Sequence, residues 1–221
     1  MALLKLEKIS KAFGGNPIIE STSFEVNPGD TIALTSPSGS GKSTMLAMAG
    51  LLMTPDSGSI IVEEGADALA FSDKQLSELR QKLLGFVFQS TQLIGSLRAI
   101  ENVIAPSNFA VGKLSFNPEE RAAELLERFG LADRMYHYPH QLSVGQKRRV
   151  AVARAMLLKP RIVIADEPTN DLDEESAKEV ANALFEYAEQ GNALLYATHV
   201  PALAKRAKTV MTLQGKTFRK S

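Results

Sequence analysis

The sequence contains no cysteine and carries no net charge, and both absences exclude classes of protein. Without cysteine there is no disulfide framework, no thiolate chemistry and no cysteine-ligated zinc site, and the composition suits a reducing compartment. The 25 basic residues balance 25 acidic residues, so no overall positive field attracts nucleic acid or acidic lipid. We therefore expect no nucleic-acid partner.

Long apolar runs are also missing. No stretch approaches the roughly 20 apolar residues that a membrane-spanning helix needs. The chain reaches a charge at Lys5, too early for the apolar region of a signal peptide. With 221 residues, of which 44% are hydrophobic and 23% charged, the chain fits one domain or two lobes that share a core. We expect a soluble, cytoplasmic protein that meets a membrane only through a partner.

Strand-like and helix-like segments alternate along the chain. Residues 18–26 have β-type composition and lead into a turn signal at 27–30, while 31–35 and 162–165 are short apolar runs typical of buried parallel strands. A further strand is expected over 192–198. Capping residues and apolar spacing predict helices over 43–52, from 72 onward, and over 117–130, 143–159 and 173–190. The alternation predicts an α/β fold with a parallel sheet and a helical insertion.

The segment from Ser36 to Thr44 lies between a predicted strand and a predicted helix, where a phosphate-binding loop belongs. Backbone N–H groups of a tight glycine loop, the positive end of the helix and one lysine suit a triphosphate. We expect Lys42 to reach the β- and γ-phosphates and the Ser43 hydroxyl to ligate Mg²⁺. Ser36 replaces the usual opening glycine, so some backbone strain is expected; the alternative is a flexible surface turn. The nucleotide-binding residues predicted in this loop are Ser36, Pro37, Ser38, Gly39, Ser40, Gly41, Lys42, Ser43 and Thr44.

Two carboxylates, Asp166 and Glu167, follow the apolar strand at 162–165. At the end of such a strand, Asp166 is predicted to face Mg²⁺, directly or through water. Glu167 is then placed to orient and polarise the attacking water as a general base. An acidic turn after a strand is the simpler alternative. Together with the phosphate loop, the pair predicts a P-loop NTPase.

Between these two motifs, Leu142-Ser143-Val144-Gly145-Gln146 resembles the Leu-Ser-Gly-Gly-Gln signature of ATP-binding cassette (ABC) ATPases. Ser143 suits the N-cap of a helix whose positive end meets an anion. The resemblance implies that this anion is the γ-phosphate bound by a second subunit, and that Ser143, Gly145 and Gln146 contact it there. Two cassettes would thus form a head-to-tail dimer around two ATP molecules. Val144 replaces a glycine, and a positive φ there would strain a β-branched residue.

The resemblance assigns four further residues. Gln89 matches the glutamine that senses Mg²⁺ and the attacking water, and His199 resembles the histidine that contacts the γ-phosphate. Asp173 lies in the loop that faces the dimer partner, and it also suits the N-cap of the following helix. Phe13 has about the spacing of the aromatic residue that stacks on adenine. Taken alone, each of these residues is more often structural.

The resemblance extends from Leu3 to about Gly215. It implies an α/β P-loop fold with a RecA-like parallel-sheet core, an N-terminal antiparallel β region and an inserted helical lobe. On this basis residues 1–89 and 159–221 form the core lobe, and residues 90–158 form the helical lobe with the signature motif.

The function implied is that of the ATP-hydrolysing subunit of a membrane ABC transporter, with ATP and Mg²⁺ as cofactors. Its partners would be integral-membrane permease subunits and a second cassette, as a homodimer when ATP is bound, on the inner face of the cell membrane. Residues 84–89, Leu97 and 100–103 are similar to the lipoprotein-releasing, macrolide-exporting and cell-division cassettes. Two alternatives stay open: a cassette for DNA repair or translation, and a binding-only cassette with little turnover. The basic run 147–149 is predicted to be a solvated helix face.

Overall fold

The computed structural model describes residues 1–37 and 39–221, and each strand and helix predicted above is present. The strands are β1 (Leu4–Phe13), β2 (Asn16–Val26), β3 (Thr31–Thr35), β4 (Ser57–Val62), β5 (Leu84–Val87), β6 (Ile162–Asp166), β7 (Ala193–Ala197), β8 (Thr209–Gln214) and β9 (Thr217–Lys220). The α-helices are α1 (Lys42–Ala49), α2 (Asp73–Leu83), α3 (Ala99–Ile104), α4 (Pro118–Arg128), α5 (Val144–Met156), α6 (Glu174–Glu189) and α7 (Pro201–Ala204).

The centre of the molecule is a six-stranded sheet in the order β5-β6-β7-β3-β8-β9. Neighbouring strands are parallel, except that β9 runs antiparallel to β8. Along β6, Ile162 and Ile164 belong to the core that includes α1, whereas Val163 and Ala165 belong to the core that includes α5 and α6. Both faces of the strand are therefore covered by helices, which explains why the run is apolar at every position.

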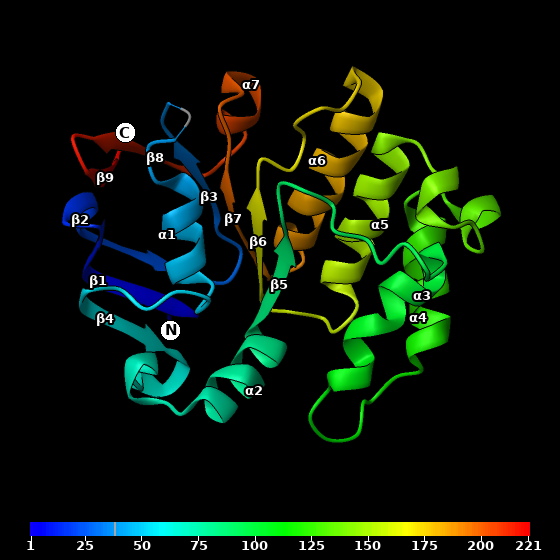
Figure 1. Cartoon of the computed structure of the whole chain (residues 1–221), viewed down its shortest axis with the longest axis horizontal. Helices are drawn as coiled ribbons and strands as arrows, with labels where there is room; N and C mark the ends of the chain where they lie inside the picture. The colour runs from blue at the N-terminus through cyan, green and yellow to red at the C-terminus, as the bar shows by residue number, and fades with distance from the viewer. Residues whose placement is uncertain (38) are drawn as a thin grey trace.

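A second, antiparallel sheet has the order β2-β1-β4 and confirms the predicted N-terminal β region. In Figure 1 it lies on the side of α1 away from α5 and α6. Helix α1 contacts β1 of this sheet as well as β6 and β7 of the larger one. The two sheets also meet where the Glu20 N–H donates to the Lys216 carbonyl at 2.7 Å. The phosphate-loop helix is thus fixed between two sheets.

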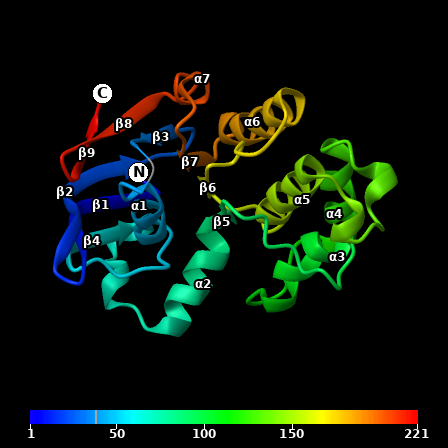
Figure 2. The same ribbon diagram turned by 45° about the horizontal axis from the view of Figure 1, so that its top comes forward.

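Helices α3, α4 and α5 occur between β5 and β6, where the insertion was predicted. Figure 2 shows them grouped on one side of the molecule, with both sheets on the other. Helix α5, which begins at the signature residues and is called the signature helix below, packs against α6 and β5. The insertion is therefore joined to the core along this helix. Its limits at 90 and 158 stay a prediction. None of the described helices combines the length and apolar character that crossing a membrane requires.

The helix starts follow the predicted capping residues. Ser72 and Gln75 form a capping box at α2, in which the Gln75 side chain accepts the Ser72 N–H at 2.9 Å. At α4, the Asn117 side chain accepts the Glu119 N–H at 3.0 Å, and a proline occupies the first helical position. These contacts satisfy backbone donors that have no partner inside the helix.

Helix α1 ends at Ala49 and not at Leu52 as predicted. Leu51 has a left-handed backbone with φ of 55°, which stops the helix. A Cβ at Gly50 would lie 2.5 Å from a ring carbon of Phe86 on β5. The helix therefore ends where its backbone meets an aromatic ring of the sheet, a contact that local sequence does not reveal.

Candidate nucleotide site

The loop between β3 and α1 has the backbone of a phosphate-binding turn. Gly39 and Gly41 have φ of 74° and 111°, a region that other residues enter only with strain. A Cβ at Gly41 would lie 2.8 Å from a methyl group of Ile18 on β2. No side chain caps the start of α1 at Gly41, so its first N–H groups are available to an anion. Ser38, also predicted to bind nucleotide, lies outside the described residues.

Lys42, the first residue of α1, is held across this loop. Its side chain is 7% exposed, and its Nζ donates to the carbonyls of Ser36 at 2.9 Å and Pro37 at 3.3 Å. The same Nζ lies 3.6 Å from Oε1 of Glu167. A buried ammonium with two carbonyls and one carboxylate as neighbours is well placed to exchange these partners for phosphate oxygens.

The strain predicted at Ser36 is not found. Its φ is not among the positive values of the described residues, so a serine fits there as well as a glycine. The Ser36 hydroxyl is hydrogen-bonded to that of Ser40, whose Oγ also lies 2.6 Å from the Pro37 carbonyl. Serine at position 36 therefore adds a side-chain hydrogen bond within the loop.

The two carboxylates that follow β6 have different surroundings. Burial is the main cause that raises the pKa of Asp166, and the nearby charge of Glu167 acts in the same direction. A hydrogen bond with Ser43 and the charge of Lys42 oppose that rise. Such a carboxylate is short of positive charge, and a divalent cation would supply it.

Glu167 is 8% exposed and has a left-handed backbone with φ of 45°. Its Oε2 lies 2.9 Å from Nδ1 of His199 and 3.3 Å from the His199 backbone N–H. Its other oxygen faces Lys42, so the carboxylate is held between two nitrogen groups. A non-glycine residue in this conformation is strained, and such strain concentrates at functional sites.

A cavity of about 450 Å³ lies between the phosphate loop and the two carboxylates, whereas Ser36, Pro37 and His199 line a neighbouring hollow. It is lined by Phe13, Ile18, Gly39, Gly41, Lys42, Ser43, Thr44, Gln89, Asp166 and Glu167. Phe13 is 47% exposed, which leaves an aromatic face available in the wall of the cavity. The structure thus brings most of the residues predicted for one nucleotide site into one place.

The donors in the cavity fit Mg²⁺. Over residues 1–37, 39–63 and 65–221, no three acidic or histidine side chains gather into a metal site of their own. Magnesium at a phosphate site takes only one or two carboxylates and completes its shell with hydroxyl, phosphate and water oxygens. The hydrogen-bonded Ser43 and Asp166 present oxygen atoms of the kind that such a shell takes, and Gln89 lies in the same cavity.

The signature residues form the start of α5. The Ser143 side chain accepts the Gln146 N–H at 3.2 Å, and the Gln146 side chain accepts the Ser143 N–H at 2.9 Å. Ser143 is exposed, and Val144 is the first helical residue, 55% exposed and without a positive φ. Valine is therefore tolerated at this position without strain.

Glycine is required at position 145 because a side chain there would collide with α6. A Cβ there would lie 2.4 Å from Oγ and 2.9 Å from Cβ of Ser176 on α6. Asp173 caps α6, because its carboxylate accepts the Ser176 N–H at 2.9 Å, and it would lie 3.8 Å from the same Cβ. The signature and Asp173 therefore belong to one surface formed by the starts of α5 and α6.

That surface is separate from the cavity. Among the described residues, the cavity is lined by neither the signature residues nor Asp173. The two groups of predicted nucleotide-binding residues thus lie in different parts of one chain.

The prediction that the basic run 147–149 is a solvated helix face is wrong for Arg148 and Arg149. Arg148 is 3% exposed, and its Nη1 and Nη2 donate to the carbonyls of Phe88 and Gln89, both at 2.6 Å. Arg149 donates to the Phe129 carbonyl at 3.1 Å and forms an ion pair with Glu179 at 2.7 Å. Helical spacing was the available signal, because residue 148 lies on the face of α5 that also buries residues 151, 152 and 155.

Comparison with known proteins agrees with this geometry. Residues 19–170 match the family model described as ABC transporter. The lipoprotein-releasing system ATP-binding protein LolD of Bacteroides thetaiotaomicron is 38% identical over 96% of this chain and 98% of its own length. The protein of the same name from Hyphomonas neptunium is 41% identical over 92% of this chain and 89% of its own.

A solved structure extends the comparison to three dimensions. The ATP-binding cassette MJ0796, described as a dimer in a post-hydrolysis state bound to ADP and phosphate, superposes with a TM-score of 0.89 at 31% identity. The alignment covers 99% of this chain and 97% of that one. The fold predicted from the sequence is confirmed by this likeness.

Proposed function

Because this chain belongs to the ABC transporter family, as one of its ATP-binding and ATP-hydrolysing subunits, we propose that the cavity at Lys42 is its hydrolysis site and that a membrane permease is its partner. The observation that carries the first part is the buried carboxylate of Glu167, held between the ammonium of Lys42 and the imidazole of His199. ATP and Mg²⁺ are the ligands of the family.

Different residues of the cavity bind the phosphates, the adenine and the metal ion. Lys42 and the loop N–H groups bind the phosphates of ATP, and Phe13 stacks on the adenine. Ser43 and Asp166, with Gln89 beside them, would hold Mg²⁺, which neutralises charge on the β- and γ-phosphates when bound.

Glu167 accepts a proton from the water that attacks the γ-phosphorus. The bond from that phosphorus to the bridging oxygen breaks, and ADP leaves with the electron pair. Nδ1 of His199 is engaged by Glu167, so Nε2 is the ring nitrogen left to contact the γ-phosphate.

Replacing Glu167 by glutamine tests this assignment. Glu167→Gln keeps the shape of the side chain but cannot accept the proton, so hydrolysis should fall about 10²–10⁴-fold while ATP binding is retained. The matched control is Glu189→Gln, the same chemical change at an exposed position near the end of α6. Normal phosphate release by Glu167→Gln would remove this residue from the role.

The separation of the cavity from the signature surface supports a composite site in which each copy completes the other. Cassettes of this family dimerise, and we take the native pair of this chain to be a homodimer when ATP is bound. Ser143, Gly145 and Gln146 of one copy would then close on the γ-phosphate held by its partner, with Asp173 beside them.

Mixing two inactive variants tests the composite site. Lys42→Ala damages the cavity and Ser143→Arg damages the signature surface, so each variant alone should hydrolyse little ATP. A mixed pair contains one intact composite site, and activity should reappear on mixing. If the mixture stays as inactive as its components, each copy works with its own signature and the arrangement is wrong.

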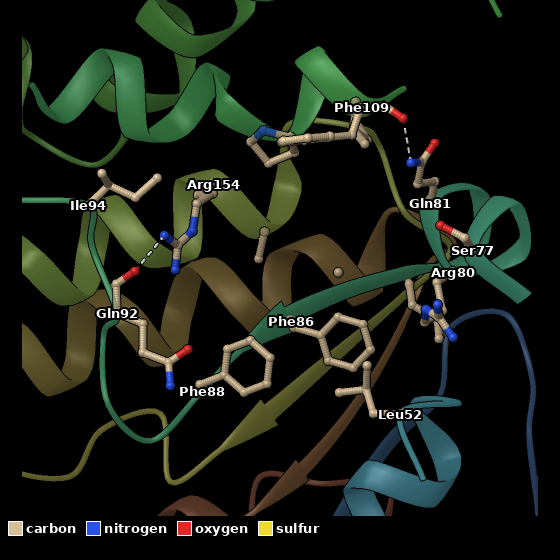
Figure 3. Close-up of a pocket in the computed structure, with 15 residues that line it drawn as sticks. Leu52, Ser77, Arg80, Gln81, Phe86, Phe88, Gln92, Ile94, Phe109 and Arg154 are labelled. Carbon is tan, nitrogen blue, oxygen red and sulfur yellow. Dashed lines mark hydrogen bonds between the residues drawn. The ribbon is translucent and has the colours of Figure 1, made fainter. Parts of the chain in front are cut away.

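The membrane partner has a suitable surface beside Gln89. A groove of about 530 Å³, shown in Figure 3, is lined by the apolar side chains of Leu52, Phe86, Phe88, Ile94 and Phe109. Phe109 is 76% exposed and Ile94 47%, an unusual exposure for such residues. We take a helix of a permease to occupy this groove, which would hold the chain at the inner face of the cell membrane.

The relatives point to the kind of permease. Those described above are named lipoprotein-releasing system ATP-binding proteins, so we assign a lipoprotein-releasing permease as the partner. Phe109→Ser should abolish co-purification with that permease and leave the ATPase activity of the isolated chain unchanged. Tyr136→Ser, which removes another exposed aromatic outside the groove, serves as the control. Binding to a macrolide-type permease instead would overturn the choice of partner.

A further inference from the structure

The segment that follows β5 is attached to the signature helix at both ends. Arg148 donates from Nη1 to the Phe88 carbonyl and from Nη2 to the Gln89 carbonyl, both at 2.6 Å. Six residues further along α5, Arg154 donates to the carbonyls of Gln92 at 2.9 Å and Thr91 at 3.0 Å. Figure 3 shows the contact of Arg154 with Gln92. Residues 88–92 are therefore held by α5 and not only by the sheet.

The geometry at Arg148 is that of a rigid clamp. A guanidinium is planar, and two donors in one fork fix both the distance and the orientation of two successive carbonyls. Arg148 is 3% exposed, and its Nε has no hydrogen-bond partner among the described residues. Burial lowers the pKa of Arg148, and the charge of Asp171 opposes that change. Among the described residues, the Arg148 guanidinium thus hydrogen-bonds only to the backbone carbonyls of Phe88 and Gln89.

Those two residues lead directly into the nucleotide cavity, which the Gln89 side chain lines. The same helix begins at Ser143, whose exposed end faces the partner's nucleotide in the function proposed above. Any shift of α5 on dimer closure must therefore move the Gln89 backbone with it, because a buried charged hydrogen bond is costly to break.

We propose that Arg148 is a positioning residue for ATP hydrolysis, which couples the signature helix of one subunit to Gln89 in the same subunit's nucleotide cavity. This inference rests on the proposed function of Gln89 and of the signature. It adds a residue that does not touch the nucleotide and that acts only through the backbone of its neighbour.

Steady-state kinetics test the coupling. Arg148→Met removes both hydrogen bonds but keeps an apolar stem, so kcat should fall about tenfold, whereas KM for ATP should change by less than about twofold because the phosphate loop is untouched. Arg148→Lys has a single ammonium and should give an intermediate kcat. The Mg²⁺ concentration that gives half-maximal ATPase activity should rise from the parent through Arg148→Lys to Arg148→Met.

The matched control is Arg149→Met, because the neighbouring arginine is also largely buried but bonds to the Phe129 carbonyl and to Glu179 on α6, and not to the segment that follows β5. It should lower thermal stability as Arg148→Met does and leave kcat and the Mg²⁺ dependence near those of the parent. An equal loss of kcat in both variants would show that Arg148 is only structural.

Hydrogen exchange supplies a readout that needs no nucleotide. In the nucleotide-free protein, Arg148→Met should accelerate amide exchange within residues 88–92, and Arg149→Met should not. Unchanged exchange in residues 88–92 would show that Arg148 does not hold this segment, whatever happens to ATPase activity.

A double-mutant cycle with Gln89→Ala shows whether Arg148 acts through that residue. If it does, adding Arg148→Met to Gln89→Ala should cost little further kcat. Multiplicative losses would refute the route through Gln89. A parent protein that does not hydrolyse ATP would instead refute the proposed function, so the two failures are distinct.

Discussion

A methyl group added at Gly145 would test how closely the signature helix packs on α6. Gly145→Ala places a Cβ 2.4 Å from Oγ and 2.9 Å from Cβ of Ser176. The hydroxyl could rotate away, but the Ser176 Cβ belongs to a helix and cannot. The two helices must therefore separate by a few tenths of an ångström, or one of them must tilt.

The expected cost follows from two opposing effects. Alanine is favoured over glycine in a helix by about 1 kcal/mol, and this gain is smaller in the first turn. Overpacking a close contact costs about 1–3 kcal/mol. We therefore expect Gly145→Ala to lower the free energy of unfolding by up to about 2 kcal/mol, which corresponds to a fall in Tm of about 4–8 °C for a domain of this size.

Activity should fall more than binding. Gly145 does not line the cavity, so the affinity of the single chain for ATP should be unchanged, while hydrolysis that depends on the partner's signature should decrease. Thermal unfolding measures the stability, nucleotide titration measures the affinity for ATP, and phosphate release measures the rate of hydrolysis.

A second substitution isolates the contact. Ser176→Gly removes both atoms that the new methyl group would meet and keeps the backbone N–H that Asp173 caps. Gly145→Ala should therefore cost less in the Ser176→Gly background, with a coupling energy of at least about 0.5 kcal/mol. If Gly145→Ala is as stable as the parent and equally active, the contact is not rigid and the packing argument is refuted.

Three other substitutions have defined outcomes. Lys42→Ala should weaken ATP binding about 10–100-fold in a nucleotide titration, because it removes charged hydrogen bonds to phosphate. Asp166→Asn should abolish the effect of Mg²⁺ on nucleotide binding yet raise the Tm of the nucleotide-free protein. Because burial raises the pKa of Asp166 in the folded chain, the cost of its charge is absent below the ordinary pKa of an aspartate. The gain in Tm should therefore grow as the pH rises from that ordinary value to the raised pKa, and stay constant above it. Tyr187→Phe should lower Tm by about 2–6 °C, because the buried Tyr187 hydroxyl donates to the Pro160 carbonyl at 2.7 Å and that oxygen would lose its partner.

The sequence predicts well those features that depend on neighbours in the chain. The capping boxes at Ser72 and Ser143 are set by residues three positions apart, and the apolar run at 162–165 is set by helices on both faces of a strand. The phosphate loop has the same character, since its glycines and lysine lie within a few residues of one another.

The features that were missed depend on residues far apart in the chain. Arg148 meets the carbonyls of Phe88 and Gln89 across a separation of about 60 residues, and nothing in a basic run shows which of its members is buried. Likewise, the contact of Glu167 with His199 requires β6 and β7 to be neighbours. Strand order decides such contacts, and local composition does not encode it.

The pattern of glycines kept and replaced in the two motifs follows from the backbone. Gly39 and Gly41 have positive φ, and Gly145 has no room for a side chain beside α6, so another residue would be strained at the first two positions and would clash at the third. Ser36 and Val144 have neither restriction, and Val144 is open to solvent on the first turn of α5. A departure from the family motif weakens a site only where the glycine was needed for its conformation or its size. Within the single chain neither need exists at Ser36 and Val144, so we expect that reverting either residue to glycine would change ATPase activity little.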